Sequence, residues 1–227
     1  MNPTDSRVLC IKIGQPVLLR FDDGSEMESA IRKQPVESVK VDEHGLVGND
    51  VGLKAHHGGV DKAVFLMSAD SFEQLNRLTG KSFGYEGEAV YCENLVLSGL
   101  NEKNVRVGDV YQIGTCLLEI AQPRRPCSRL SKNSSYPVMK ETIFASGLTG
   151  WYARVIKGGE IRRGNSVILQ QAGHPDLSIM ALNRLLSADG VPYPDKIQTA
   201  LDYPPLAEAF KRSLRDKLNG GDGMVKG

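Results

Sequence analysis

The sequence predicts an α+β protein that is mainly β, with a partly closed β-barrel followed by a small module of three helices. Short apolar runs separated by glycine-containing turns recur up to about residue 172, which is typical of a small barrel and not of a parallel sheet. Beyond that point, apolar residues recur at helical spacing. We therefore expect a barrel domain at 1–172, a three-helix module at 173–218 and a flexible tail at 219–227.

Alternating or continuous apolar runs predict the strands of the barrel domain. The first two runs that can pair flank Asp22-Asp23-Gly24-Ser25, which is turn chemistry and predicts a hairpin. An irregular loop near 42–61 contains several glycines, and a loop of this length is more often functional than not. The predicted strands are 8–13, 17–21, 26–31, 36–41, 62–67, 94–97, 109–113, 116–121, 151–156 and 166–170.

Helix signals occur twice inside the barrel domain and three times after it. Ser68 can cap a helix that carries Phe72, Leu75 and Leu78 on one face, and Gly80 can end it in a left-handed conformation. A shorter helix is predicted within the domain, and three more form the module. Their predicted ranges are 138–146, 176–188, 195–201 and 204–218.

Charge, hydropathy and cysteine spacing exclude several classes of function. Lys and Arg total 28 against 27 Asp and Glu, so a general attraction to nucleic acid or membranes is not expected. No window approaches the roughly 18 consecutive apolar residues of a membrane span, and the N-terminus lacks the order of a secretory signal. The four cysteines form no Cys-x-x-Cys pair, which argues against a zinc ribbon or a disulfide framework. We expect a cytoplasmic protein with free thiols.

A loop rich in glycine and histidine is the first candidate site. Lys54, His56, His57 and Lys62 surround Gly58-Gly59 just before a buried strand. Glycines let a backbone approach a ligand closely, and the lysines add positive charge, so a phosphate-like anion is a reasonable ligand. Adjacent histidines in an extended chain point to opposite sides, which argues against both binding one metal ion. An ordinary loop with one packed and one solvated histidine is the alternative.

The second candidate site is the stretch Gln122-Pro-Arg-Arg-Pro-Cys-Ser-Arg129. Pro123 and Pro126 should end the preceding strand and hold Cys127 in a stiff turn at its edge. The three arginines around Cys127 favour the thiolate, the form that attacks electrophiles or binds soft metals. Cys127 is therefore the predicted functional thiol, with a purely structural thiol as the alternative.

Four further side chains are expected in the core. Cys10, Cys92 and Cys116 lie in apolar, strand-like surroundings, where a free cysteine usually behaves as a small apolar residue. Trp151, the single tryptophan, could stack against a planar substrate, but a core position is the more frequent one.

Taken together, the motifs resemble those of the MOSC family, the molybdenum cofactor sulfurase C-terminal domain. The resemblance spans roughly residues 7–220 and is greatest to a stand-alone bacterial branch that carries a three-helix (3-alpha) module. It implies a MOSC-type barrel that binds the molybdopterin form of the molybdenum cofactor. The motifs are His56–Val64, Glu93-Asn94-Leu95, Arg106-Val107-Gly108-Asp109 and Gln122–Cys127.

The resemblance also implies roles for individual residues. Cys127 matches the cysteine that binds molybdenum, or that carries persulfide sulfur in sulfurase relatives. The residues implied to line the cofactor pocket are Lys54, His56, His57, Lys62, Asn94 and Arg124. The implied activity is the reduction of N-hydroxylated compounds, such as 6-N-hydroxylaminopurine-type base analogues and amidoximes, to the amine and water. Two alternatives stay open, a cofactor or sulfur carrier that uses a Cys127 persulfide and a simple anion-binding module.

The implied reaction needs a proton source and an electron donor. His57 is the expected catalytic proton donor, with His56 as the alternative, because histidine titrates near neutral pH. The sequence has no dinucleotide-binding fingerprint and no cysteine cluster for iron and sulfur. We therefore expect electrons to arrive from a separate reductase, a flavin or iron–sulfur protein.

Overall fold

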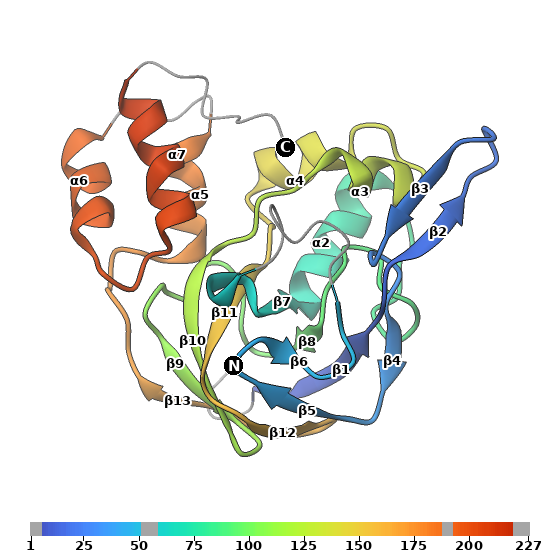
Figure 1. Cartoon of the computed structure of the whole chain (residues 1–227). Coiled ribbons are helices and arrows are strands. Elements are labelled where there is room, and N and C mark those ends of the chain that lie inside the picture. Colours follow the sequence, from blue (N-terminus) through green and yellow to red (C-terminus); the bar gives the residue numbers. More distant parts are fainter. Residues whose placement is uncertain (1–5, 51–58, 188–192, 220–227) are drawn as a thin grey trace.

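An eight-stranded mixed sheet forms the centre of the molecule in the computed structural model, which describes residues 6–50, 59–187 and 193–219 (Figure 1). Its strand order is β13-β9-β10-β11-β7-β8-β1-β4, and neighbouring strands are antiparallel except for the parallel pair β7 and β8. With the helices around it, the sheet confirms the predicted α+β class. The strands are β1 Val8–Ile13, β4 Gln34–Val36, β7 Val64–Ser68, β8 Leu95–Leu97, β9 Val110–Ile113, β10 Cys116–Pro123, β11 Trp151–Lys157 and β13 Val167–Gln171.

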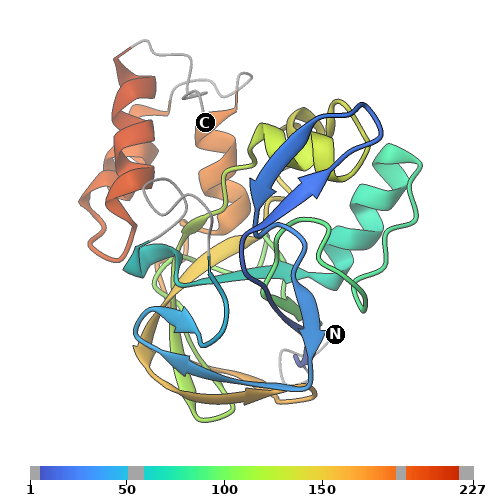
Figure 2. The same ribbon diagram turned by 45° about the vertical axis from the view of Figure 1, so that its right-hand side comes forward.

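The large sheet curls back on itself, which Figure 2 shows as a curved wall of strands. Arg7, just before β1, forms an antiparallel bridge with Ser166, just before β13. The Val8 amide also donates to the Asn165 carbonyl at 2.9 Å. These bonds join the region before β13, at one edge of the sheet, to β1, which is next to the other edge. The curved sheet is therefore partly closed.

Two smaller sheets complete the β structure. One contains β12 Gly159–Arg162, β5 Ser38–Asp42 and β6 Gly45–Leu46, and the other is a ribbon of β2 Val17–Arg20 and β3 Glu26–Ser29 that projects from the body (Figure 1). The sequence does not predict β12, because Ile161 is its single apolar residue. The predicted strand at 36–41 is also wrong as one element. The stretch is divided at Glu37 into β4 and β5, which belong to different sheets. The Glu37 carbonyl accepts the Arg163 amide.

Three helices pack near the ends of β7 and β10: α2 Ala69–Thr79, α3 Ser128–Asn133 and α4 Met139–Ser146. The predicted caps of α2 are observed. The Ser68 hydroxyl accepts the Asp70 amide at 3.1 Å, and Gly80 is left-handed with φ 65°. The sequence does not predict α3, which begins directly after Cys127. That cysteine therefore stands between a strand and a helix, where the sequence predicted only a turn.

The last three helices are α5 Ile179–Leu186, α6 Pro194–Asp202 and α7 Glu208–Leu218, which lie together beside β10 and β11 in Figure 1. Their buried apolar side chains belong to the same core cluster as those of β1, β7 and β10. The module therefore shares a core with the barrel, and the division of the chain near residue 172 stays a prediction. The predicted tail beyond Asn219 lies outside the described residues.

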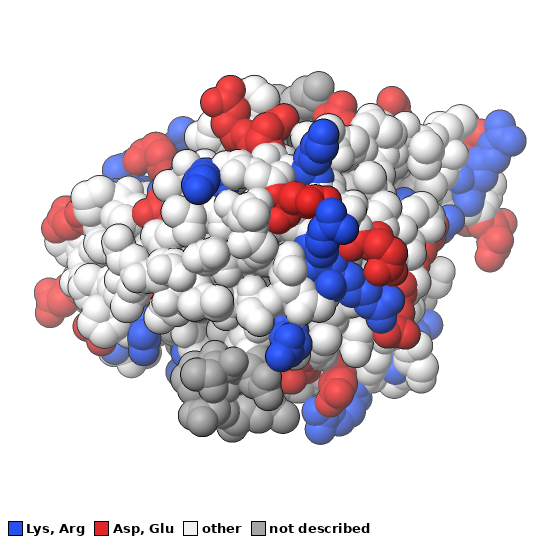
Figure 3. Space-filling model, turned by 90° about the horizontal axis from the view of Figure 1, so that it is seen from below, with Lys and Arg blue, Asp and Glu red and all other residues white. Residues whose placement is uncertain are grey.

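The surface carries charges of both signs. Figure 3 shows acidic and basic side chains interspersed on one face, in keeping with the near-equal totals in the sequence. No helix in the described part of the chain is long and apolar enough to cross a membrane.

Candidate functional site

A pocket containing Cys127 opens beside the C-terminal end of β10, next to β7 and β11. Its empty volume is about 870 Å³, part of which is open to solvent. The lining combines two thiols, two aromatic rings and several cations with few acids. The lining side chains include Lys33, Lys62, Phe65, Cys92, Asn94, Arg124, Cys127, Arg129 and Tyr152.

Cys127 is held at the entrance to α3. Strand β10 ends at Pro123, and Cys127 then has an extended backbone (φ −117°, ψ 164°) from which α3 starts. Its carbonyl accepts the Leu130 amide at 3.1 Å, so the turn is fixed by the helix that follows. The thiol is free and half-buried, and it lines the pocket. The structure therefore places the predicted functional thiol on a pocket wall.

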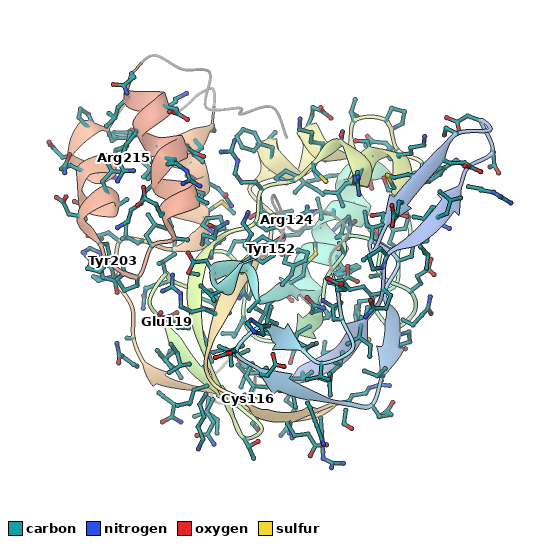
Figure 4. All side chains as sticks on the ribbon, in the orientation of Figure 1. Cys116, Glu119, Arg124, Tyr152, Tyr203 and Arg215 are labelled. Carbon is teal, nitrogen blue, oxygen red and sulfur yellow. The ribbon has the colours of Figure 1, made fainter. Side chains whose placement is uncertain are left out.

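Arg124 provides a buried cation beside Cys127. Its side chain is 5% exposed, and the guanidinium lies 5.2 Å from the centre of the Phe65 ring. It also donates to the Tyr152 hydroxyl, and Figure 4 shows these two side chains close together. Burial raises the pKa of Tyr152 to about 12, while Arg124 opposes the rise. In the described part of the chain no acid forms an ion pair with Arg124, so its charge is open to an anionic ligand.

Lys33 is a second buried cation, which the sequence analysis did not identify. It lies directly before β4 and is 2% exposed. Burial lowers the pKa of Lys33, and nearby Arg124 lowers it further, whereas Cys92 and Glu93 oppose the shift. None of the acids in residues 6–50, 59–187 and 193–219 forms an ion pair with it. Because an uncompensated buried charge is costly, Lys33 and Arg124 together favour an anion in this pocket.

Cys92 is not the packed core residue that the sequence predicts. It is half-buried, lines the pocket, and accepts a hydrogen bond from Lys33. Its Sγ lies 3.7 Å from the Ala30 carbonyl oxygen, to which it donates. The reason is a left-handed backbone, with φ 72°, between the buried residues Tyr91 and Glu93. A left-handed cysteine gives no signal in the sequence.

The other core predictions agree with the structure. Cys10 and Cys116 are buried, and burial raises the pKa of both thiols, that of Cys116 to about 11. Figure 4 shows Cys116, the first residue of β10, far from Arg124, which follows the other end of that strand. Trp151 is fully buried, so it belongs to the core and does not wall the pocket.

Asn94 lines the pocket but also joins strands. Its side-chain oxygen accepts the Phe65 amide at 3.2 Å, and its NH₂ group donates to the Lys12 carbonyl at 3.0 Å. These bonds connect β7 to β1 through the residue before β8. One lone pair and one N–H remain for a ligand. Its predicted contact with a cofactor stays a prediction.

Lys62 lines the pocket and lies near Arg212 of the C-terminal helix α7. It lies in the 3-10 turn Val60–Lys62, where burial lowers its pKa, and Arg212 of α7 and Arg125 add to that effect. Arg125 in turn donates to the Ser213 hydroxyl of α7. Thus α7 adds charge and a hydrogen-bond partner beside the site.

The predicted residues Lys54, His56 and His57 lie outside the described residues. The residues on either side of that gap, Asp50 and Gly59, both line the pocket. Their contacts with a ligand stay predictions.

Comparison with known proteins identifies the family. The MOSC domain model matches residues 54–168. The chain belongs to the MOSC domain family. It is 31% identical to the protein YiiM of Escherichia coli over 185 residues, which cover 72% of this chain and 79% of that protein.

Two further similarities agree with this membership. The crystal structure of YiiM from Geobacillus stearothermophilus has a TM-score of 0.76 and 26% identity, and the match covers 94% of this chain and 99% of that one. A protein of Gibberella moniliformis named "Reductase" is 31% identical over 170 residues, but the match covers only 30% of its length. The chain is thus a YiiM-like MOSC protein, which associates it with the molybdenum cofactor.

The described pocket fits that group. Cys127 offers one soft sulfur ligand, which suits a thiophilic metal. Lys33 and Arg124 offer charge without carboxylate partners in the part of the chain that the structure describes, which suits a phosphate.

Proposed function

We propose that this protein binds the molybdenum cofactor in the Cys127 pocket and reduces N-hydroxylated compounds to the amine and water. The substrates would be hydroxylaminopurine-type base analogues and amidoximes. The observation that carries the proposal is the pocket itself, in which a half-buried thiol lies beside two buried cations without carboxylate partners among the described residues. In a MOSC chain, this combination suits an anionic, metal-bearing cofactor.

The protein would hold the cofactor by two kinds of contact. The Cys127 thiolate would bind the metal, and Arg124 with Lys33 would face the cofactor's negative charges at the inner wall. Lys62 at the rim, together with the predicted Lys54, His56, His57 and Asn94, would complete the cradle. Cys92 has a left-handed backbone and Cys127 stands directly before α3, and both thiols line this pocket.

The reaction consumes two electrons and two protons for each N–O bond broken. When bound, the cofactor supplies the two-electron chemistry that accepts oxygen from an N-hydroxyl group. The chain orients the substrate, excludes water and delivers protons, for which His57 is the predicted donor. We propose that a separate flavin or iron–sulfur reductase delivers the electrons, because the sequence has no cysteine cluster for iron and sulfur and no dinucleotide-binding fingerprint.

A carrier of sulfur or of the cofactor is the second candidate function. The observation that favours it is the presence of two thiols, Cys92 and Cys127, in one pocket. A carrier would hold a persulfide on Cys127 and would show no reductase activity of its own. A persulfide assay on freshly isolated protein separates it from the reductase.

Replacing Cys127 by Ser tests the reductase. Protein from a cofactor-competent host is supplied with a chemical electron donor, so that no partner protein is needed, and amine formation from hydroxylaminopurine is measured. We expect the Cys127→Ser variant to lose more than about 100-fold in rate, because a direct metal ligand outweighs the supporting contacts around it. Its circular dichroism should match that of the unmodified protein.

A thiol outside the pocket provides the control. Cys10 lies in β1 and does not line the pocket, so Cys10→Ala should keep the activity. Full activity in Cys127→Ser would overturn the proposal.

A further inference from the structure

Lys33 and Cys92 form a hydrogen-bonded pair in the wall of the pocket. Lys33 is 2% exposed, Cys92 is half-buried, and both line the same space as Cys127. The Lys33 ammonium donates to the Cys92 sulfur, which itself donates to the Ala30 carbonyl. A titratable side chain is thus held at a fixed position inside the pocket.

The backbone around the pair leaves little freedom. The Lys33 carbonyl accepts the Ala89 amide at 2.8 Å. The stem of Lys33 packs against Gly14, where an added Cβ would lie 3.1 Å from the Lys33 Cα. Because both its backbone and its stem are held, the positions open to the ammonium group are restricted.

The charged groups around Lys33 come from several elements. Cys92 and Glu93 precede β8, Arg124 follows β10, and Lys12 of β1 neutralises Glu93 through an ion pair of 2.5 Å. Tyr152 of β11 and Cys127 lie farther along the same wall. Burial and the cationic Arg124 favour release of a proton by Lys33, whereas Cys92 and Glu93 oppose it, and burial is the largest of these effects on the Lys33 pKa.

We propose that Lys33 donates one of the two protons consumed when the N–O bond of the substrate breaks, and that Cys92 orients it. This proposal rests on the proposed function. In the balanced reaction, R–NH–OH takes up two electrons and two protons and gives R–NH₂ and H₂O. One proton goes to nitrogen and one to the departing oxygen, and Lys33 supplies the latter before it regains a proton from solvent at the pocket mouth. Cys92 is a positioning residue in this scheme.

The Lys33→Arg variant separates charge from proton donation. Arginine keeps the cation but does not release a proton in the working pH range. We expect unchanged molybdenum and pterin contents, a similar KM, and a kcat about 10²- to 10⁴-fold lower, which is the usual contribution of a general acid. The kcat of the unmodified protein should also fall as pH rises through the lowered Lys33 pKa, and this limb should be absent in Lys33→Arg.

An amine-labelling experiment on cofactor-free protein provides a readout besides activity. Lysines are acylated at a series of pH values, and each site is quantified by peptide mass spectrometry. Lys33 should become reactive at lower pH than the exposed Lys103, and Cys92→Ala should change the pH at which it does so. Lys103→Arg, the matched control, should leave kcat unchanged.

Several results would overturn the assignment. An unchanged kcat and pH profile in Lys33→Arg would exclude Lys33 as the donor while leaving the proposed function intact. Loss of the cofactor from Lys33→Arg would show that Lys33 acts only in holding the cofactor. Labelling of Lys33 at the same pH as Lys103 would exclude a lowered pKa of Lys33. If the loaded, unmodified protein reduces no N-hydroxylated compound, the proposed function fails, and the role of Lys33 fails with it.

Discussion

Two buried lysines, Lys12 and Lys33, interact with the short segment Cys92-Glu93, and only one of them has a carboxylate partner among the described residues. Lys12 is fully buried, and its Nζ lies 2.5 Å from Oε1 of the equally buried Glu93. Lys33 is just as inaccessible but donates to the thiol of Cys92. The first charge is satisfied inside the protein, whereas the second faces the pocket.

This difference separates a structural charge from a functional one. Glu93 also accepts the Tyr91 amide at 2.9 Å, so the Lys12 pair fixes the segment that carries Cys92. Burial of Lys33 without a carboxylate partner lowers its pKa, and holding its charge there costs free energy. An anionic ligand would relieve it, which is why the unpaired lysine marks the site and the paired one does not.

The largest expected effect is on the paired lysine. Replacing Lys12 by Met leaves Glu93 buried without a cation, so we expect the free energy of unfolding to fall by about 3–5 kcal/mol. Urea denaturation followed by circular dichroism measures it. The double variant Lys12→Met/Glu93→Leu should regain most of the loss, because it removes both charges. An unchanged stability in the single variant would contradict a structural role for the pair.

A much smaller effect on stability is expected at Lys33. In the cofactor-free protein, Lys33→Met removes an unpaired buried charge and should leave the free energy of unfolding within about 1 kcal/mol of the original or raise it. The same variant should retain less cofactor, since one of the two inner cations is gone. If it destabilised the protein as much as Lys12→Met, the comparison between the two lysines would be wrong.

The smallest predicted effect is a dependence on pH. Between the lowered pKa of Lys33 in the native protein and its ordinary value of 10.5, the unfolded chain binds a proton that the native protein does not. Stability therefore rises with pH in this window. As the pH rises toward 10.5, the free energy of unfolding of the unmodified protein should therefore increase relative to that of Lys33→Met. A flat or opposite trend in urea titrations would show that the charge of Lys33 is compensated in the native protein.

Much of the fold is predictable because its signals are local. The cap of α2 needs only Ser68 and Gly80, and each is close in sequence to the helix that it bounds. The short helix α3 carries no comparable signal at its start, since Cys127, the residue before it, makes no side-chain capping hydrogen bond. Strand β12 is likewise defined by its partner β5 and not by its own pattern.

The site was predictable in part for the same reason. Cys127 and Arg124 stand out because prolines and arginines surround the thiol within one stretch. Lys33 and Cys92 have no such context, since Lys33 sits in a polar run and Cys92 in an apolar one. Only the fold brings them together, through the loop before β4 and the loop before β8.

Metal and pterin analysis tests the central claim most directly. The protein is isolated from a cofactor-competent host as the unmodified chain and as Cys127→Ser, and molybdenum and pterin are measured per chain. We predict nearly stoichiometric amounts of both in the unmodified protein and a clear loss of molybdenum in the variant. Only traces in the unmodified protein, or equal molybdenum in the two, would contradict the assignment of this pocket to the cofactor.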